Sequence, residues 1–204
     1  MLVRALIDAD TLYRRHVRNH LTWQALMGVF ELCWSPRVLD ETRAHLIERS
    51  VATFGEERAD RVEVVLGTVT EALQGAGAGF EVPEEQVAEY EGQMTNDPKD
   101  RHVLAAAVAI SASVVITGNK KDFASEDTTP WGVRALTADE FLLEQLSADT
   151  VDAVTAALGE QASFLDVDVP QLLALLGHST ATRPAFLPQF VAAYEARSGT
   201  QREV

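Results

Sequence analysis

The sequence predicts an α/β fold with a mainly parallel sheet, followed by an α-helical C-terminal extension. Through the first 143 residues, short apolar strand segments alternate with helical segments, which is typical of a domain built on a parallel sheet. From about residue 144 onward no strand candidate remains, and three helical segments follow. We therefore predict two parts, 1–143 and 144–204.

Four short segments have the character of strands. Leu2–Ile7, Ser113–Thr117 and Gly132–Leu136 are short apolar runs of strand length, and Phe80–Val82 forms a further one before Pro83. In an open parallel sheet, ligands bind outside the carboxyl ends of the strands. The polar residues that follow these segments are therefore the first candidates for a site.

Several predicted helices have capping signals at their N-termini. Ser35 before Pro36 is a cap followed by a proline at the first helical position, and Thr137 with Glu140 forms a capping box. Asp97 before Pro98 is predicted to cap a further helix. The predicted helical segments are 12–32, the one from Ser35, 56–73, 84–93, 102–111 and 141–146, then 149–158, 170–176 and 184–196 in the extension.

Composition narrows the function classes. The chain has 204 residues, ample for a buried core. Its formal charge of −14 should repel nucleic acid, so RNA contact needs a local basic patch, and a basic protein partner fits equally well. A single cysteine, Cys33, excludes an internal disulfide and a thiolate-rich zinc site, and its apolar neighbours predict a core thiol.

Nothing in the sequence predicts contact with a membrane. No stretch approaches the roughly 20 apolar residues that a span needs. Arg4, Asp8 and Asp10 interrupt the short apolar run at the N-terminus, so we expect no signal peptide. We therefore predict a cytoplasmic protein.

Acidic residues stand at the edges of several predicted elements. Asp8 and Asp10 follow the first strand, Glu41 lies in the helix that starts at Ser35, Asp100 opens the alanine-rich helix, and Asp122 follows the Ser113–Thr117 strand. Carboxylates gathered in this way form an oxygen-only pocket, which suits Mg²⁺ or Mn²⁺ and metal-assisted phosphodiester chemistry. Structural alternatives remain open, because an aspartate can cap a helix and a helical glutamate can simply be solvated.

Basic residues accompany these acids. Side chains of this kind beside a carboxylate pocket attract a phosphate backbone. For Arg14 and Arg15, a solvated helix face is an equally good explanation. The candidate substrate-binding residues are Arg14, Arg15, Lys99, Arg101, Lys120 and Lys121.

Taken in order, the motifs resemble the PIN-domain ribonucleases, in particular the toxins of bacterial VapBC toxin–antitoxin systems. The resemblance covers roughly residues 2–143. It implies a three-layer α/β/α sandwich, a site for Mg²⁺ or Mn²⁺, and hydrolysis of RNA phosphodiester bonds. The motifs that carry it are Ile7–Tyr13, Trp34–Ser35 with Glu41, Asp97–Ala107, and Val115–Asn119 leading to Lys121–Phe123.

The resemblance also implies residue roles and partners. Many relatives have asparagine where this chain has Asp10, and an acid where it has Asn119. The family pairs its toxins with a cognate antitoxin protein and often dimerises, and minimal members lack so long a helical tail. The acids carried over as catalytic residues and metal ligands are Asp8, Glu41, Asp100 and Asp122, and Thr117 matches the strand-end hydroxyl that orients a carboxylate or the attacking water.

Two other interpretations stay open at this point. Asp8-Ala9-Asp10 after a strand is also how haloacid-dehalogenase-like phosphatases begin, but the glycine expected before Thr11 and a later Gly-Asp-x-x-x-Asp motif are missing. Alternatively, the chain is a non-catalytic acidic module that binds a basic partner. The apolar faces of the tail are expected to pack on the same chain, because exposed faces of that kind need a cover.

Overall fold

A five-stranded parallel sheet forms the centre of the computed structural model, which describes residues 2–54, 60–179 and 185–201. The strands are β1 (Arg4–Ile7), β2 (Glu31–Trp34), β3 (Gly79–Glu81), β4 (Val114–Ile116) and β5 (Arg134–Leu136). Their order in the sheet is β3-β2-β1-β4-β5, and every neighbouring pair is parallel. The predicted α/β class with a parallel sheet is confirmed.

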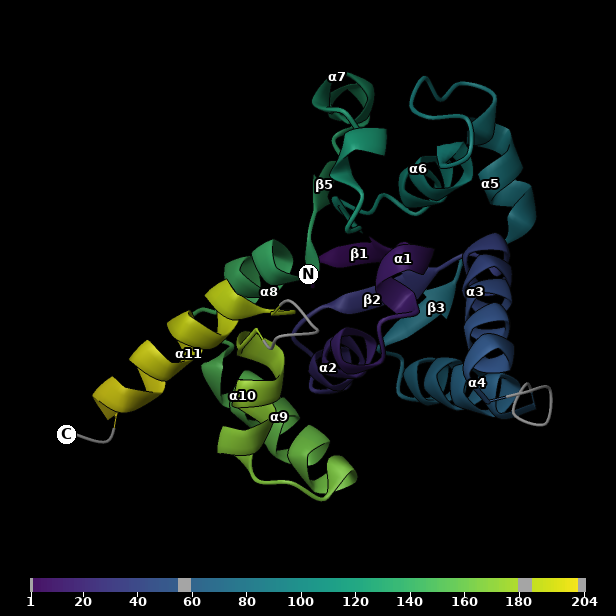
Figure 1. Cartoon of the computed structure of the whole chain (residues 1–204). Coiled ribbons are helices and arrows are strands. Elements are labelled where there is room, and N and C mark those ends of the chain that lie inside the picture. Colours follow the sequence, from purple (N-terminus) through teal and green to yellow (C-terminus); the bar gives the residue numbers. More distant parts are fainter. Residues whose placement is uncertain (1, 55–59, 180–184, 202–204) are drawn as a thin grey trace.

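Helices cover both sides of this sheet. Those that follow β3 and β4 lie on one side and those that follow β1, β2 and β5 on the other, giving the predicted three-layer sandwich (Figure 1). In the first group are α5 (Glu84–Glu91), α6 (Arg101–Ala109), η2 (Lys120–Asp122), α7 (Ser125–Thr128) and η3 (Thr129–Trp131). The others are α1 (Ala9–Leu12), α2 (Arg15–Leu26), α3 (Pro36–Phe54), α4 (Asp60–Gly75) and α8 (Ala138–Gln145).

The strands β1 and β4 are buried except for Arg4 at the start of β1. Ala5, Leu6 and Ile7 of β1 have no exposed surface, and the three residues of β4 are buried beside them. Covered on both faces, such strands are continuous apolar runs rather than alternating ones. The chain winds outward from β1 to β2 and β3 and then returns to β4, so the winding direction reverses between β1 and β4. Ligand sites lie at this kind of reversal, outside the carboxyl ends of the strands.

The prediction that residues 12–32 are mostly helical is wrong beyond Leu26. Gly28, with φ of +76°, follows the helix end, as glycine commonly does. The next apolar residues form β2, between β1 and β3. Such a short apolar segment, interrupted by Glu31, cannot be assigned to helix or strand by periodicity alone. Cys33 in β2 is fully buried, as expected of a core thiol, and burial raises its pKa to about 12.

Two of the predicted helix starts, at Ser35 and Thr137, are confirmed. Val38 N donates to Ser35 Oγ at 3.3 Å, and the capping box of Thr137 and Glu140 is present. The start predicted for the helix over 56–73 lies partly outside the described residues. Its described part begins at residue 60.

Asp97 does not cap a helix, because α6 begins at Arg101 with Asp100 as its N-cap. The Asp97 side chain accepts a hydrogen bond from Lys99 N at 3.0 Å, and Asp100 N donates to Asp97 O at 2.9 Å. This contact of an aspartate with the backbone two residues on is an Asx turn. The segment 97–100 is thus a turn that precedes the helix.

The C-terminal extension folds back onto the rest of the chain. It contains α9 (Val151–Leu165), α10 (Val169–Gly177) and α11 (Pro188–Gln201). Helix α9 packs against α2, and α11 packs against α8 (Figure 1). The apolar side chains of the extension join the same core cluster as the sheet, so its faces are covered by this chain, as expected. The predicted division at 143/144 falls within α8. Within the described ranges, no helix has both the length and the apolar character to cross a bilayer.

Candidate active site

A pocket of about 310 Å³ lies at the carboxyl ends of β1 and β4, where the winding of the sheet reverses. Three of the four predicted acids line it, and each reaches it from a different element of the fold. Its lining comprises Asp8, Ala9, Asp10, Tyr13, Glu41, Ala44, His45, Asp100 and Asn119.

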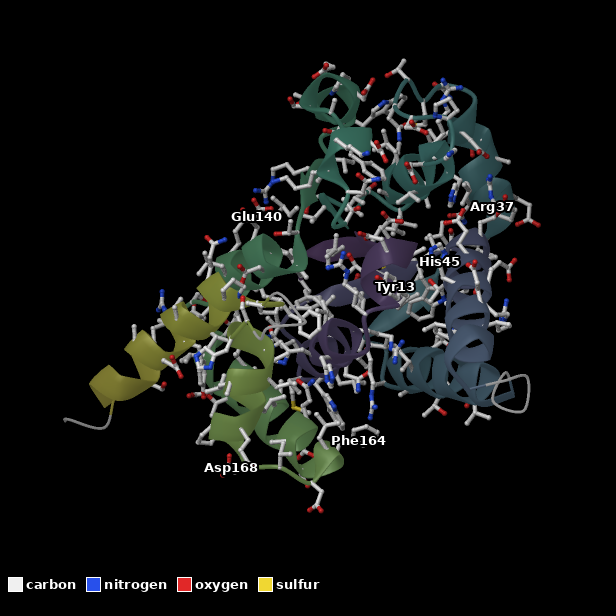
Figure 2. All side chains as sticks on the ribbon, viewed as in Figure 1. Tyr13, Arg37, His45, Glu140, Phe164 and Asp168 are labelled. Atoms are coloured by element: carbon white, nitrogen blue, oxygen red, sulfur yellow. The ribbon has the colours of Figure 1, made fainter. Side chains whose placement is uncertain are left out.

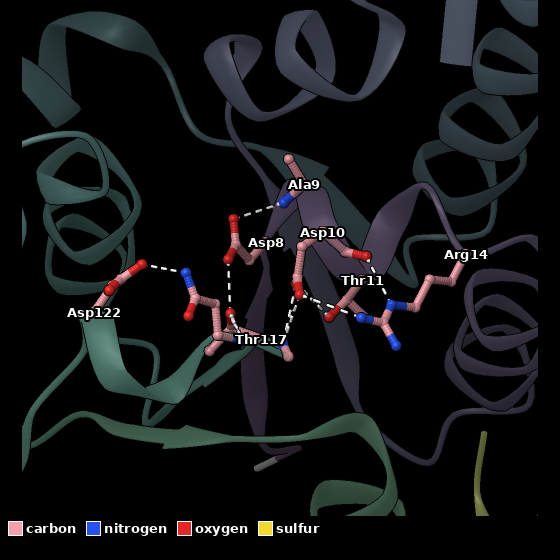
Figure 3. Close-up of polar contacts among 9 residues, drawn as sticks. Asp8, Ala9, Asp10, Thr11, Arg14, Thr117 and Asp122 are labelled. Carbon is pink, nitrogen blue, oxygen red and sulfur yellow. Dashed lines mark hydrogen bonds and ion pairs between the residues drawn. The ribbon is translucent and has the colours of Figure 1, made fainter. Parts of the chain in front are cut away.

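Asp8 is the most buried acid of this pocket, with only 5% of its surface exposed. One carboxylate oxygen accepts from Thr117 Oγ1 at 2.7 Å, and the other accepts from Ala9 N at 2.7 Å (Figure 3). Burial raises the pKa of Asp8 to about 6, and the charges of Asp10 and Asp100 add to the rise, whereas the Thr117 hydrogen bond opposes it. The hydroxyl of Thr117 therefore fixes the orientation of a buried carboxylate, which fits the role that the resemblance implies for it.

Asp100 faces the pocket from the start of α6. Burial is the largest cause that raises the pKa of Asp100, which reaches about 6. The charges of Asp122 and Asp97 also raise it, whereas His102 lowers it. Crowded like charges disfavour the ionised form of a carboxyl group. A cation placed between the acids would relieve this repulsion.

Glu41 contributes an exposed carboxylate from α3. Its Oε1 lies 3.0 Å from Nε2 of His102, which is buried on α6. Neither ring nitrogen of His102 makes a hydrogen bond of good geometry with the described residues. We therefore describe the approach as a close contact between α3 and α6, not as an aligned hydrogen bond.

Asp122 lies behind the pocket wall rather than in it. The wall is formed by Asn119, whose Nδ2 donates to Asp122 Oδ2 and whose backbone N donates to Thr117 Oγ1 at 3.0 Å. The charge of Asp122 still raises the pKa of Asp100. Asp122 thus acts on the pocket through Asn119 and through its field.

Asp10 joins the loop after β4 to the start of α1. Both of its carboxylate oxygens accept from Gly118 N at 3.0 Å, and Arg14 Nη2 lies 3.7 Å from Oδ2 (Figure 3). A side chain at Gly118 would bring a Cβ to 2.5 Å from Asp10 Oδ2, so any larger residue there would displace the Asp10 carboxylate. Of the two aspartates, it is Asp8 and not Asp10 that caps α1.

The predicted basic residues divide into two groups. Arg14, Arg15, Lys99 and Lys121 are exposed and so can reach a phosphate backbone, although Arg14 Nε also donates to Asp10 O at 3.1 Å. Two others have structural partners. Lys120 Nζ lies 2.8 Å from Glu140 Oε1, and Arg101 Nε donates to Asn96 O at 3.2 Å.

Sequence reasoning assigned no site role to Tyr13 and His45. Their rings lie 5.9 Å apart and form the wall between α1 and α3 (Figure 2). A usable signal was present for His45, which follows Glu41 by four residues on one helix. Residues four apart share a helix face.

The donor set fits a hard divalent cation. Among the described residues, no three histidine, cysteine or acidic side chains stand close enough together to bind a metal as they are now oriented. Mg²⁺, however, usually takes only one or two carboxylates directly and keeps several waters. Asp8 and Asp100 supply two such carboxylates, both with raised pKa values, and the pocket lining supplies no thiolate.

Comparisons with known proteins agree with this geometry. A sequence profile described as the PIN domain matches residues 4–121, more than half of the chain. A protein of Mycobacterium tuberculosis (strain ATCC 25618 / H37Rv), named "Putative ribonuclease VapC50", is 41% identical over 73 residues, which are 36% of this chain and 43% of that protein. The aligned part thus spans less than half the length of this relative. No solved structure matches the chain significantly.

Proposed function

The chain belongs to the PIN-domain family, and from that premise we propose that it is a metal-dependent endoribonuclease hydrolysing RNA phosphodiester bonds. The observation that carries the proposal is the pair of carboxylates Asp8 and Asp100, which face one pocket where the sheet reverses its winding. The family match spans the first three acidic motifs, and it gives no support to the phosphatase or non-catalytic alternatives.

Asp8 and Asp100 would hold Mg²⁺ or Mn²⁺, with Glu41 beside them and Asp122 acting through Asn119. A bound ion of this kind lowers the pKa of an attacking water and offsets charge on the phosphate oxygens. Thr117 keeps the Asp8 carboxylate in one orientation, so little ordering is needed during the reaction. Glu41 is the exposed carboxylate that we assign to accept the proton of the water.

The toxin of a toxin–antitoxin pair is the biological role that we propose. The name of the mycobacterial relative supports it, and the charge of −14 fits a basic segment of an antitoxin. We further propose that the protein is cytoplasmic, where its RNA and antitoxin would be found, and we keep dimerisation as a prediction. Growth arrest on expression, relieved by co-expression of the neighbouring gene, is the expected result, and harmless expression in the native host would contradict the toxin role.

The ribonuclease proposal is tested by RNA cleavage with Mg²⁺ or Mn²⁺ and with EDTA. We expect cleavage by the wild type only when the metal is present. Asp8→Asn should abolish it, whereas Asp152→Asn, at an exposed position of α9, should leave it unchanged. Undiminished cleavage in EDTA would reject the metal mechanism.

A further inference from the structure

A second cavity, of about 260 Å³, lies beside the acid pocket. Thr11, Arg14 and Gly118 line it from the sheet domain, and Thr137, Asp139 and Phe186 line it from α8 and the extension. We propose that this cavity, here called the flanking subsite, binds the base of the nucleotide next to the cleaved bond. The proposal rests on the ribonuclease function proposed above and names the part of the RNA that the extension recognises.

The flanking subsite and the acid pocket share one wall. Asp10 lines the acid pocket and Gly118 lines the flanking subsite, and the Gly118 amide donates to the Asp10 carboxylate. Arg14 stands at the same wall, with Nη2 3.7 Å from Asp10 Oδ2 (Figure 3). Only this shared wall therefore separates the flanking subsite from the acid pocket, so neighbouring nucleotides of one RNA strand can occupy the two.

The extension holds Phe186 in place at this subsite. Leu176 O accepts hydrogen bonds from Phe186 N at 2.9 Å and from Leu187 N at 2.8 Å. The carboxylate of Asp139, on α8, accepts from Gln189 N at 3.1 Å and from Phe190 N at 2.9 Å, so α8 fixes the start of α11. The wall that carries Phe186 is thus built by docking of the extension, and it is absent from a domain that ends near residue 143.

The size and lining of the flanking subsite suit a single nucleobase better than a complete small-molecule ligand. The cavity is smaller than the roughly 300–1,000 Å³ of typical small-molecule sites. Phe186 is part-exposed and offers apolar surface for stacking, and its ring lies 5.9 Å from that of His16. The Arg14 guanidinium is paired with Asp10, but 42% of its side chain remains exposed for contact with a phosphate.

Most other polar groups of the subsite are already engaged. The Asp139 carboxylate is held by the amides of α11, and Thr137 Oγ1 is held by Glu140. Few groups remain to read the edge of a base by hydrogen bonds. Because every base has a π face, stacking is tolerant of sequence, so we expect binding strength rather than base selectivity.

The test compares two phenylalanines of the same extension. Phe186→Ala removes the stacking surface, whereas Phe164→Ala removes an aromatic ring that is 67% exposed on α9. KM and kcat are measured on a short single-stranded RNA, together with Mn²⁺ binding by calorimetry and the melting temperature. We expect Phe186→Ala to raise KM on the order of tenfold, the scale of one lost base stack, with kcat and Mn²⁺ affinity unchanged. Phe164→Ala should behave as the wild type.

A wild-type KM in folded Phe186→Ala overturns the subsite, and so does a variant that loses binding of an antitoxin but not of RNA. If Phe186→Ala fails to fold, Phe186→Leu keeps apolar volume without the ring. It should show the same rise in KM, and a wild-type KM in this variant also overturns the proposal. Absence of RNA cleavage by the wild type would instead reject the ribonuclease function, so the two failures are distinguishable.

Discussion

The acid pocket and the junction between α2 and α9 both bury polar side chains, but with opposite consequences. In the pocket, Asp8 and Asp100 are carboxyl groups whose pKa values are raised by burial and by neighbouring acids. At the junction, His20 and Gln161 have no exposed surface, and burial lowers the pKa of His20 to about 4, so the ring is neutral. Buried neutral groups with hydrogen bonds are tolerated well, whereas buried like charges cost free energy until a cation joins them.

The junction is a hydrogen-bonded relay between distant parts of the chain. Gln161 Nε2 donates to His16 O at 3.3 Å, which leaves Gln161 Oε1 to accept from His20 Nδ1 at 2.8 Å. His20 Nε2 then accepts from Gln24 Nε2 at 2.9 Å. The relay therefore assigns the proton of the neutral ring to Nδ1. The comparison teaches that the junction serves stability and the pocket serves chemistry, so substitutions in the two regions should separate these properties.

The largest expected effect is on the chemistry of the pocket. Asp8→Asn removes a metal ligand with almost no change of volume and relieves repulsion with Asp10 and Asp100. We expect cleavage to fall by orders of magnitude, while the melting temperature of the metal-free protein at neutral pH stays equal or rises. Cleavage kinetics and calorimetry on the same preparation check this. A marked fall in melting temperature would show that Asp8 is mainly structural.

The junction should show the reverse pattern. Gln161→Leu leaves His20 and the His16 carbonyl without their partner in a buried place, which costs on the order of 2–3 kcal/mol of unfolding free energy. Urea denaturation measures the loss, with the exposed Gln74→Leu as the control. Below the unfolding transition, kcat and Mn²⁺ affinity should match the wild type. A loss of Mn²⁺ affinity in folded protein would mean that the two regions are not separable.

The difference between the regions also explains what could be predicted from sequence. Ser35 and Thr137 act through neighbours in the chain, so both helix starts were predictable. The family was predicted from motifs in order and is confirmed by the PIN-domain match. The pairing of His20 with Gln161 joins residues 141 apart, and no local pattern indicates it. Strand β2 was missed because its three apolar residues, Leu32–Trp34, carry no periodic signal of their own.

Within the site, residues at strand ends were easier to predict from sequence than which side chains line the pocket and which lie behind it. Asp8 and Thr117 follow buried strands directly, so their convergence followed from the parallel sheet. That Asn119 lines the pocket and Asp122 lies behind it depends on the turn of η2, which spacing does not specify. Arg18, which looks like part of a solvated basic face, is 3% exposed and donates to Leu12 O at 3.2 Å.

A third prediction uses pH to sharpen the comparison. The pKa values of Asp8 and Asp100 are raised to about 6 in the folded protein, so folding favours their protonated forms. This stabilisation is fully present below about pH 4 and is lost as the pH rises through about 6. The melting temperature of the metal-free protein should therefore fall over this interval, and Asp8→Asn should flatten the slope.

One buried base acts in the opposite direction over this interval. Burial lowers the pKa of His20 to about 4, so folding becomes less favourable for His20 as the pH drops below about 6.5, which offsets part of the slope from the two acids. Arg37 lowers the pKa of Glu91, and Lys120 lowers that of Glu140, so their stabilising effect changes only below the usual range of a glutamate.

Addition of Mg²⁺ should remove the fall in melting temperature, because the ion stabilises the ionised acids. Cleavage should decline as the pH drops through about 6, since protons then compete with the metal. Equal pH slopes of the melting temperature in the wild type and in Asp8→Asn, both without metal, would contradict the buried-charge account, because His20 is the same in both proteins.

The smallest expected effect separates two acids three residues apart. Asp97 is exposed and its side chain accepts from Lys99 N in the turn before α6. Asp97→Ala should thus lower stability by about 0.5–1 kcal/mol and spare most of the cleavage. Asp100→Ala removes a half-buried acid that its neighbours repel. The metal-free protein should melt at an equal or higher temperature, and cleavage should fall by orders of magnitude. If Asp97→Ala is instead the inactive variant, the metal ligand is Asp97 in the turn and not Asp100 at the start of α6.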